Sequence, residues 1–96
     1  MMQYMPAVLL ARAREVRDDG SIVEIVVWQL AEALAPCEHR YKYWLAYVEN
    51  GQCVVRYDNE RGKGDHRHIG GVENDYRFVS LAQLLADFRN DVENRK

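Results

Sequence analysis

The sequence predicts an α+β domain, in which an antiparallel sheet of four to five strands carries a C-terminal amphipathic helix packed on one face. Three observations predict this fold class. Apolar and polar residues alternate in several segments, as they do in half-buried strands. Short motifs rich in Asp, Asn and Gly separate these segments and favour turns. Near the C-terminus, the apolar spacing changes to that of a surface helix.

The first two strands form a predicted hairpin. Residues 7–16 alternate in polarity, and residues 21–29 are rich in Ile and Val. Asp18-Asp19-Gly20 between them favours a tight turn, because glycine readily adopts positive φ and aspartate tolerates it. Residues 31–37 are a connector, in which Pro36 would end any helical turn.

A second group of strands follows the connector. Residues 39–48 and 52–58 are two strands, and Asn50-Gly51 between them is typical of a type I′ hairpin turn. Residues 66–69 are a short fifth strand, and residues 76–79 are a further extended segment. The aromatic residues of these strands, which include Trp28, Trp44 and a row of tyrosines, are expected to be half-buried sheet residues rather than a stacking platform for RNA bases.

The last element is a helix over residues 81–93. Ser80 is its predicted N-cap, with Gln83 as the capping-box partner. The apolar positions of this helix recur at helical spacing and are Leu81, Leu84, Leu85, Phe88 and Val92. This stripe is expected to pack on one face of the sheet.

Length and composition are those of one small globular domain, residues 1–96. Of the 96 residues, 48% are hydrophobic and 29% are charged, and the net charge of −2 argues against a broad phosphate-binding face. No apolar run is long enough to span a membrane, and the N-terminus lacks the pattern of a signal peptide, so a cytoplasmic protein is expected. Cys37 and Cys53 form no disulfide framework or metal knuckle, and Cys53 is expected to be a small core residue.

The segment from residue 56 to residue 68 contains two histidines, several cations and several carboxylates, which are the groups that could take part in catalysis. If residues 66–69 are extended, His66 and His68 point to one side and Arg67 to the other. A hairpin with the preceding strand would place Asp58 near His66 or His68. His39, by contrast, is expected to be a surface residue.

This cluster suits cleavage of an RNA phosphodiester. One of the imidazoles of His66 and His68 can take the proton of the 2′-hydroxyl, and the other can donate a proton to the leaving oxygen. Asp58 can orient a histidine and fix its tautomer. The cations that can bind the phosphate and stabilise its developing charge are Arg56, Arg61, Lys63 and Arg67. This chemistry needs no cofactor.

Two other interpretations use the same residues. Asp58, His66 and His68 could instead hold a divalent metal such as Zn²⁺ or Mn²⁺ with an open position. The segment could also be a solvated hairpin whose histidines only form hydrogen bonds. The residue types alone leave all three interpretations open.

Several motifs resemble the TumE family of small toxins of type II toxin–antitoxin pairs. They are Asp19-Gly20-Ser21-Ile22-Val23-Glu24, His39-Arg40-Tyr41-Lys42-Tyr43, Tyr57-Asp58-Asn59, His66-Arg67-His68-Ile69-Gly70 and Tyr76-Arg77-Phe78. The resemblance implies a growth-inhibiting toxin, neutralised by a cognate DNA-binding antitoxin, with RNA as its target. It gives weight to Asp58, His66 and His68, and it adds Asn59 as a substrate-binding residue.

The function therefore has three candidate forms. The first is a ribonuclease that acts through the His-x-His hairpin. The second is a non-catalytic module that binds RNA or a protein, and the third is an enzyme that modifies RNA or nucleotides. The edge strands of so small a sheet would also allow a homodimer.

Overall fold

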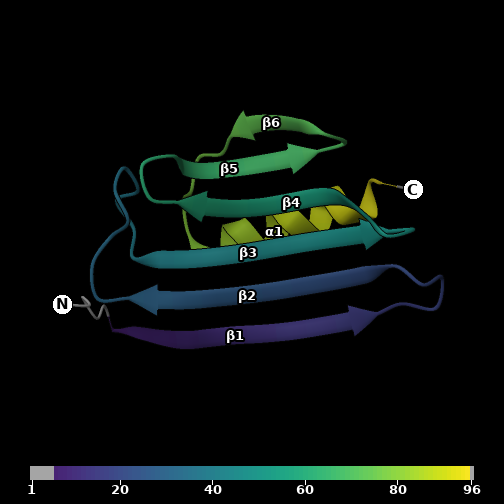
Figure 1. Cartoon of the computed structure of the whole chain (residues 1–96), viewed down its shortest axis with the longest axis horizontal. Helices are drawn as coiled ribbons and strands as arrows, with labels where there is room; N and C mark the ends of the chain where they lie inside the picture. The colour runs from purple at the N-terminus through teal and green to yellow at the C-terminus, as the bar shows by residue number, and fades with distance from the viewer. Residues whose placement is uncertain (1–5, 96) are drawn as a thin grey trace.

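One antiparallel sheet and one helix make up the fold. The structure, a computed structural model, describes residues 6–95. Its elements are β1 (Ala7–Val16), β2 (Ile22–Leu30), β3 (Tyr41–Glu49), β4 (Gln52–Glu60), β5 (Gly64–Ile69), β6 (Val72–Asp75) and α1 (Leu81–Glu93). The strands pair in the order in which they follow one another along the chain, and α1 lies behind the central strands in Figure 1. The predicted α+β class is confirmed.

The sheet of the described residues has six strands, where the sequence predicted four to five. The additional strand is β6, which follows the turn at Gly70 and Gly71, two residues with φ of 57° and 84°. Its sequence, Val-Glu-Asn-Asp, lacks apolar alternation because β6 is an exposed edge strand. The predicted extended segment at residues 76–79 is not a strand and leads into α1.

The local signals for the other turns and for the N-cap of the helix are confirmed, whereas the predicted capping-box bond from the Gln83 side chain is not formed. Asn50 and Gly51 have φ of 51° and 77°, as a type I′ turn requires. The Ser80 hydroxyl accepts a hydrogen bond from the Gln83 N–H at 3.1 Å, so Ser80 is the N-cap of α1. The side chain of Gln83 bonds Asp87 at 2.7 Å, four residues further along α1.

The core lies between α1 and the central strands. Leu84, Phe88 and Val92 of α1 are buried, and the predicted apolar stripe does pack on the sheet. The sheet contributes the fully buried side chains of its central strands, chiefly Tyr43, Leu45, Tyr47, Val55 and Tyr57. These residues alternate along β3 and β4, so period two decides which side chains reach α1.

The opposite face of the sheet carries the intervening residues. Within residues 6–95 α1 is the only helix, so this second face, called the open face below, has no helix packed on it. It includes Trp44 of β3, Arg56 and Asp58 of β4, and His66 and His68 of β5. No helix of the described residues is long and apolar enough to cross a membrane.

The two cysteines have different surroundings. Cys37, at the end of the connector, is buried, whereas Cys53 is exposed. The expectation that Cys53 belongs to the core is wrong, because a register shift in the β3–β4 pairing places Cys53 opposite Val48, on the open face next to the β3–β4 turn. Burial raises the pKa of both thiols, so neither is an activated thiolate.

Candidate functional site

Two histidines of β5 lie on the open face beside two charged residues of β4. His66 and His68 are separated by one residue, so their side chains leave the strand on the same side. In the β4–β5 hairpin, Asp58 lies opposite His66 and Arg56 lies opposite His68. The structure thus brings Asp58 next to the histidine pair, as the strand periodicity predicted.

His68 is the more accessible of the two histidines, with 22% of its side chain exposed. Its Nε2 lies 2.8 Å from Nη2 of Arg56 and 3.6 Å from Oε1 of Glu73. A guanidinium only donates hydrogen bonds, so the bond from Arg56 requires a free lone pair on Nε2 of His68. In this arrangement, His68 presents the acceptor nitrogen that a general base needs.

His66 has the opposite hydrogen-bonding surroundings. Its Nδ1 donates to the carbonyl oxygen of Gly64 at 3.1 Å, because a carbonyl can only accept. Its Nε2 lies 3.3 Å from Oδ1 of Asp75 and 3.8 Å from Oε1 of Glu73. A proton on Nε2 would therefore have carboxylate acceptors close by. This is the arrangement expected of a histidine that carries a proton for donation.

Glu73 of β6 joins the two histidines to a cation, and it was missed in the sequence. Its Oε1 accepts a hydrogen bond from Nζ of Lys63 at 2.6 Å. The bond from Lys63 lowers the pKa of Glu73, with His68 and His66 adding to the effect, so this carboxyl group stays ionised. The Gly70-Gly71 turn was the available signal, because a two-residue hairpin there places Glu73 opposite His68.

Arg56 connects this cluster to an aromatic ring. Its guanidinium carbon lies 5.2 Å from the ring centroid of Trp44, and its Nε lies 3.6 Å from Oδ2 of Asp58. Within residues 6–95, this Nε is buried without a hydrogen-bond partner. Trp44 is 41% exposed, so it is more accessible than Trp28, which is half-buried as expected.

Three predicted substrate-binding residues lie apart from this cluster. Asn59 is fully buried on the α1 side, where its amide bonds the backbone N–H of Tyr43 and the carbonyl of Tyr41. Arg67 also points to the α1 side, as predicted for the residue between the two histidines, and lies 3.7 Å from Asp91. Arg61 is exposed in the turn between β4 and β5. The structure brings only Arg56 and Lys63 of the predicted cations to the histidine pair.

A second polar cluster lies on the α1 side around Asp65. Oδ1 of Asp65 is 2.8 Å from Nε2 of His39 and accepts a hydrogen bond from the Tyr43 hydroxyl at 2.6 Å. Oδ2 accepts from the Cys37 thiol at 3.4 Å. His39 also stacks on Phe78, with ring centroids 3.8 Å apart. The expectation that His39 is a surface residue is therefore wrong.

In the second cluster, the polar side chains bond one another and the backbone rather than presenting free ligand atoms. Nδ1 of His39 accepts from the backbone N–H of Tyr41 at 3.2 Å, so the ring proton is on Nε2 and points at Asp65. Both nitrogens of His39 are thus occupied. Burial, followed by the neighbouring Asp65, raises the pKa of the Cys37 thiol. A metal would need a free Nε2 and a thiolate, and this network supplies neither.

The metal alternative concerned Asp58, His66 and His68. Within residues 6–95, one group of three His, Cys, Asp or Glu side chains has its donor atoms within 4.8 Å of one another. That group is Cys37, His39 and Asp65 of the second cluster. The structure does not bring the donor atoms of Asp58, His66 and His68 together in this way.

Comparison with known proteins identifies a family. The family model described as Toxin TumE matches residues 6–96, which is nearly the whole chain. No curated protein and no solved structure matches the chain.

Proposed function

The chain belongs to the TumE toxin family, and we propose that it inhibits growth as a cytoplasmic ribonuclease whose active site is the histidine cluster on the open face. The observation that carries this proposal is the pair His66 and His68, which share the open face of the sheet with Arg56 and lie close to Lys63, His66 being more deeply buried than His68. Two imidazoles beside two cations are the groups needed to transfer protons and to bind a phosphate.

The hydrogen-bond partners assign different roles to the two histidines. His68 is the general base, because its Nε2 presents a lone pair to Arg56. His66 is the general acid, because acceptors face both of its ring nitrogens, the Gly64 carbonyl at Nδ1 and the Asp75 carboxylate at Nε2. An RNA phosphate would compete for the Arg56 guanidinium and release Nε2 of His68 to take a proton.

The reaction is an internal transesterification. His68 removes the proton of the 2′-hydroxyl, and the 2′-oxygen forms a bond to phosphorus while the bond from phosphorus to the 5′-oxygen breaks. His66 donates its proton to that leaving oxygen. The products are a 2′,3′-cyclic phosphate and a 5′-hydroxyl. Arg56 and Lys63 stabilise the negative charge that builds on the phosphate oxygens.

The test is cleavage of total cellular RNA by the purified protein and by His66→Ala and His68→Ala, each with and without EDTA. Loss of either proton-transfer group is expected to slow cleavage by about 100-fold or more, with no effect of EDTA. Asn74→Ala is a matched control on the exposed strand β6 and should cleave at the wild-type rate. The proposal is wrong if both histidine variants cleave RNA as fast as the wild type. A loss of cleavage in EDTA would favour the metal alternative.

A second candidate is a module that binds RNA without cutting it. The exposed ring of Trp44 beside Arg56 favours this reading, because both groups bind bases and phosphates irrespective of catalysis. It predicts saturable binding of single-stranded RNA that Trp44→Ala weakens, with the RNA recovered intact. Multiple turnover would exclude it.

Membership in a toxin family implies an antitoxin partner. We propose that this antitoxin carries a DNA-binding domain, as pairs of this type commonly regulate their own genes. Binding of the isolated toxin–antitoxin complex, but not of the toxin alone, to its own promoter DNA in a mobility-shift assay would support this assignment.

A further inference from the structure

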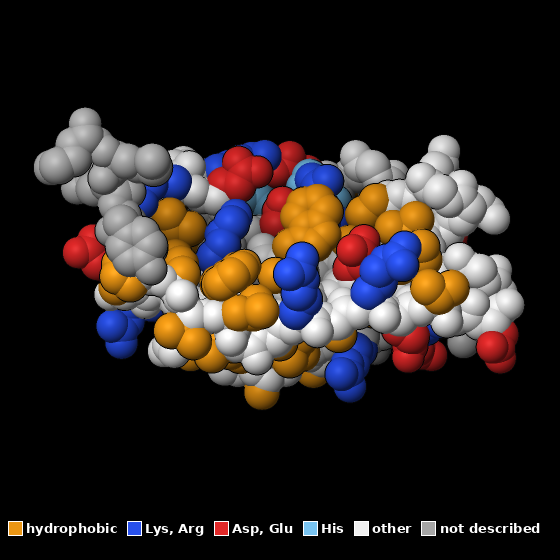
Figure 2. Space-filling model, turned by 60° about the horizontal axis from the view of Figure 1, so that its bottom comes forward, with side chains coloured by type: hydrophobic (Ala, Val, Ile, Leu, Met, Phe, Trp, Pro, Cys, Tyr) orange, Lys and Arg blue, Asp and Glu red, His pale blue; other side chains and the backbone are white. Residues whose placement is uncertain are grey.

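Among the residues that the structure describes, the edge strand β1 is a long strand with one unpaired side. It has ten residues and lies at one border of the sheet, where, within residues 6–95, β2 is its only strand partner. The exposed fractions of Val8, Leu9, Leu10 and Val16 are 61%, 41%, 45% and 61%. When the β1 border is turned forward, hydrophobic side chains lie along it with separate Lys and Arg side chains among them (Figure 2). The backbone N–H and C=O groups of the free side can pair with a further strand.

The other border of the sheet, strand β6, is less suited to the addition of a strand. β6 has four residues, and two of them are the acidic residues Glu73 and Asp75 that face the histidine pair. A strand added there would gain few hydrogen bonds and would meet like charge if it were acidic. Of the two edges, β1 is therefore the one suited to strand addition.

Two arginines on β1 favour an added strand that carries acidic residues. Arg12 and Arg14 alternate with Ala11 and Ala13, so both guanidinium groups belong to the open face. In the register with β2, Arg12 lies opposite Val26 and Arg14 lies opposite Glu24. Within the described residues, no ion pair joins Arg12 or Arg14 to a carboxylate, so carboxylates on an added strand could bind Arg12 directly and could share Arg14 with its cross-strand neighbour Glu24.

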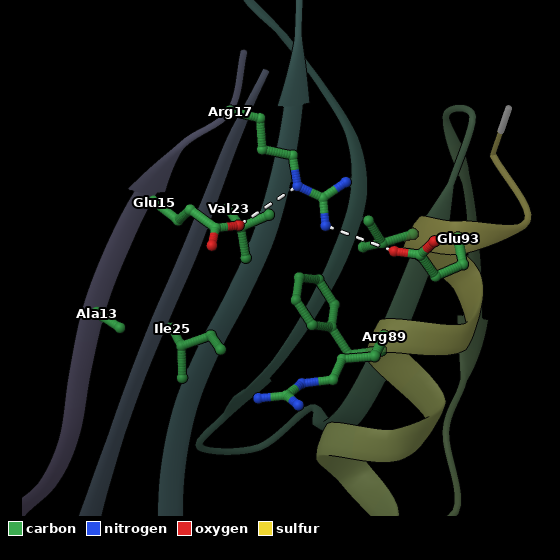
Figure 3. A pocket seen from close by; sticks show the side chains of 9 residues that line it. Ala13, Glu15, Arg17, Val23, Ile25, Arg89 and Glu93 are labelled. Carbon is green, nitrogen blue, oxygen red and sulfur yellow. Dashed lines mark hydrogen bonds and ion pairs between the residues drawn. The ribbon is translucent and has the colours of Figure 1, made fainter. Parts of the chain in front are cut away.

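The α1 side of β1 offers an apolar hollow. A groove of about 480 Å³ lies between α1 and the first two strands, since α1 covers the central strands only. Its apolar lining is Ala13, Val23, Ile25, Phe88 and Val92. At one end, Arg17 spans the groove, with ion pairs of 3.4 Å to Glu15 and 3.5 Å to Glu93 (Figure 3). Side chains of an added strand that point to this side would enter the groove.

We propose that an extended segment of the antitoxin adds to β1 as a seventh strand. Its acidic residues, at alternate positions, lie opposite Arg12 and Arg14 on the open face. The residues between them are apolar and fill the groove beside α1. The backbone of the β1 edge supplies affinity, while the two cations and the groove fix the register. The proposal rests on family membership for the partner and is independent of the ribonuclease assignment.

The experiment compares backbone hydrogen exchange of the free chain with that of the complex purified after co-expression with its antitoxin. Alternate amides of residues 7–16, those on the free side of β1, are expected to become protected in the complex. The double variant Arg12→Glu/Arg14→Glu should weaken antitoxin binding by about tenfold or more, with a loss of salt dependence. The control Arg77→Glu/Arg95→Glu introduces the same charge away from β1 and should bind as the wild type does.

Two results would overturn the proposal. The first is unchanged exchange in β1 together with wild-type binding by the Arg12→Glu/Arg14→Glu variant, which would place the antitoxin elsewhere. The second is a free chain that is dimeric by light scattering with β1 amides already protected, which would mean that a second copy occupies the edge. Circular dichroism and urea unfolding of each variant separate loss of binding from loss of fold.

Discussion

Asn59 is a buried residue of β4 whose side-chain amide bonds the backbone of β3 just beyond the last backbone pair of the two strands. The regular register between β3 and β4 ends at Trp44 and Asp58. One residue further along β4, the Asn59 side chain bonds the backbone of Tyr43 at 3.0 Å and that of Tyr41 at 2.7 Å. Asn59 therefore holds the end of β3 in place, although it was predicted to bind substrate.

The change Asn59→Ala should lower the free energy of unfolding by about 2–4 kcal/mol, because two buried backbone groups lose their partners. Urea unfolding measures this loss. The control is Asn74→Ala on the exposed strand β6, which is expected to change stability by less than about 0.5 kcal/mol. Equal stabilities of the two variants would show that the Asn59 bonds contribute little.

Neighbouring residues of one motif thus point to opposite faces of the sheet and make different contacts. In Tyr57-Asp58-Asn59, the outer residues face α1, and Asp58 faces the open side beside His66. The alternation follows from the sequence, because successive strand residues point to opposite faces. Which face is covered depends on where α1 packs, and the sequence motif contains no information about that.

At the scale of elements, α1 and the hairpins are specified locally. Ser80 marks the start of the helix, and the helical spacing of the apolar residues shows how far it extends. The same apolar residues form the stripe that packs on the sheet. The β5–β6 hairpin is equally local, but its polar second strand resembles a loop in the sequence. As a result, Glu73 was overlooked, although it contacts Lys63 and both histidines.

The cap of α1 permits a direct test. Ser80→Ala removes the acceptor of the Gln83 N–H and should lower the free energy of unfolding by about 1 kcal/mol. Ser80→Asp keeps an acceptor at this position and should retain wild-type stability in the same urea titration. If Ser80→Ala unfolds at the wild-type urea concentration, the cap does not limit the stability of the domain.

At the scale of the whole molecule, three tyrosine hydroxyls tie separate parts of the fold to carboxylates. Tyr76 bonds Asp87 of α1 at 2.5 Å, Tyr57 bonds Asp91 of α1, and Tyr43 bonds Asp65 of β5. Burial raises the pKa of each of these tyrosines, and the bonded carboxylate raises it further. The folded state therefore holds these protons more tightly than the unfolded chain does.

The sign of the resulting pH dependence follows from this difference. Unfolded tyrosines lose their protons near pH 10. Above that pH the folded state binds more protons than the unfolded state, so the free energy of unfolding must fall as the pH rises. We expect a fall between about pH 10 and pH 11, and a shallower one in a variant with Phe at positions 43, 57 and 76. Urea unfolding over this range measures it, and a flat wild-type profile would contradict it.

The sequence by itself determined the first five strands, the turns between them, the helix and the shared direction of His66 and His68. Those features depend on residues that are close along the chain, so they can be predicted from the hydrophobic periodicity, the helix cap and the turn motifs. Only the tertiary structure decided that Arg56 and Glu73 meet His68, that Asn59 bonds the backbone of β3, and that His39 joins Asp65. These contacts depend on strand pairing and on the face that α1 covers, which no local pattern specifies.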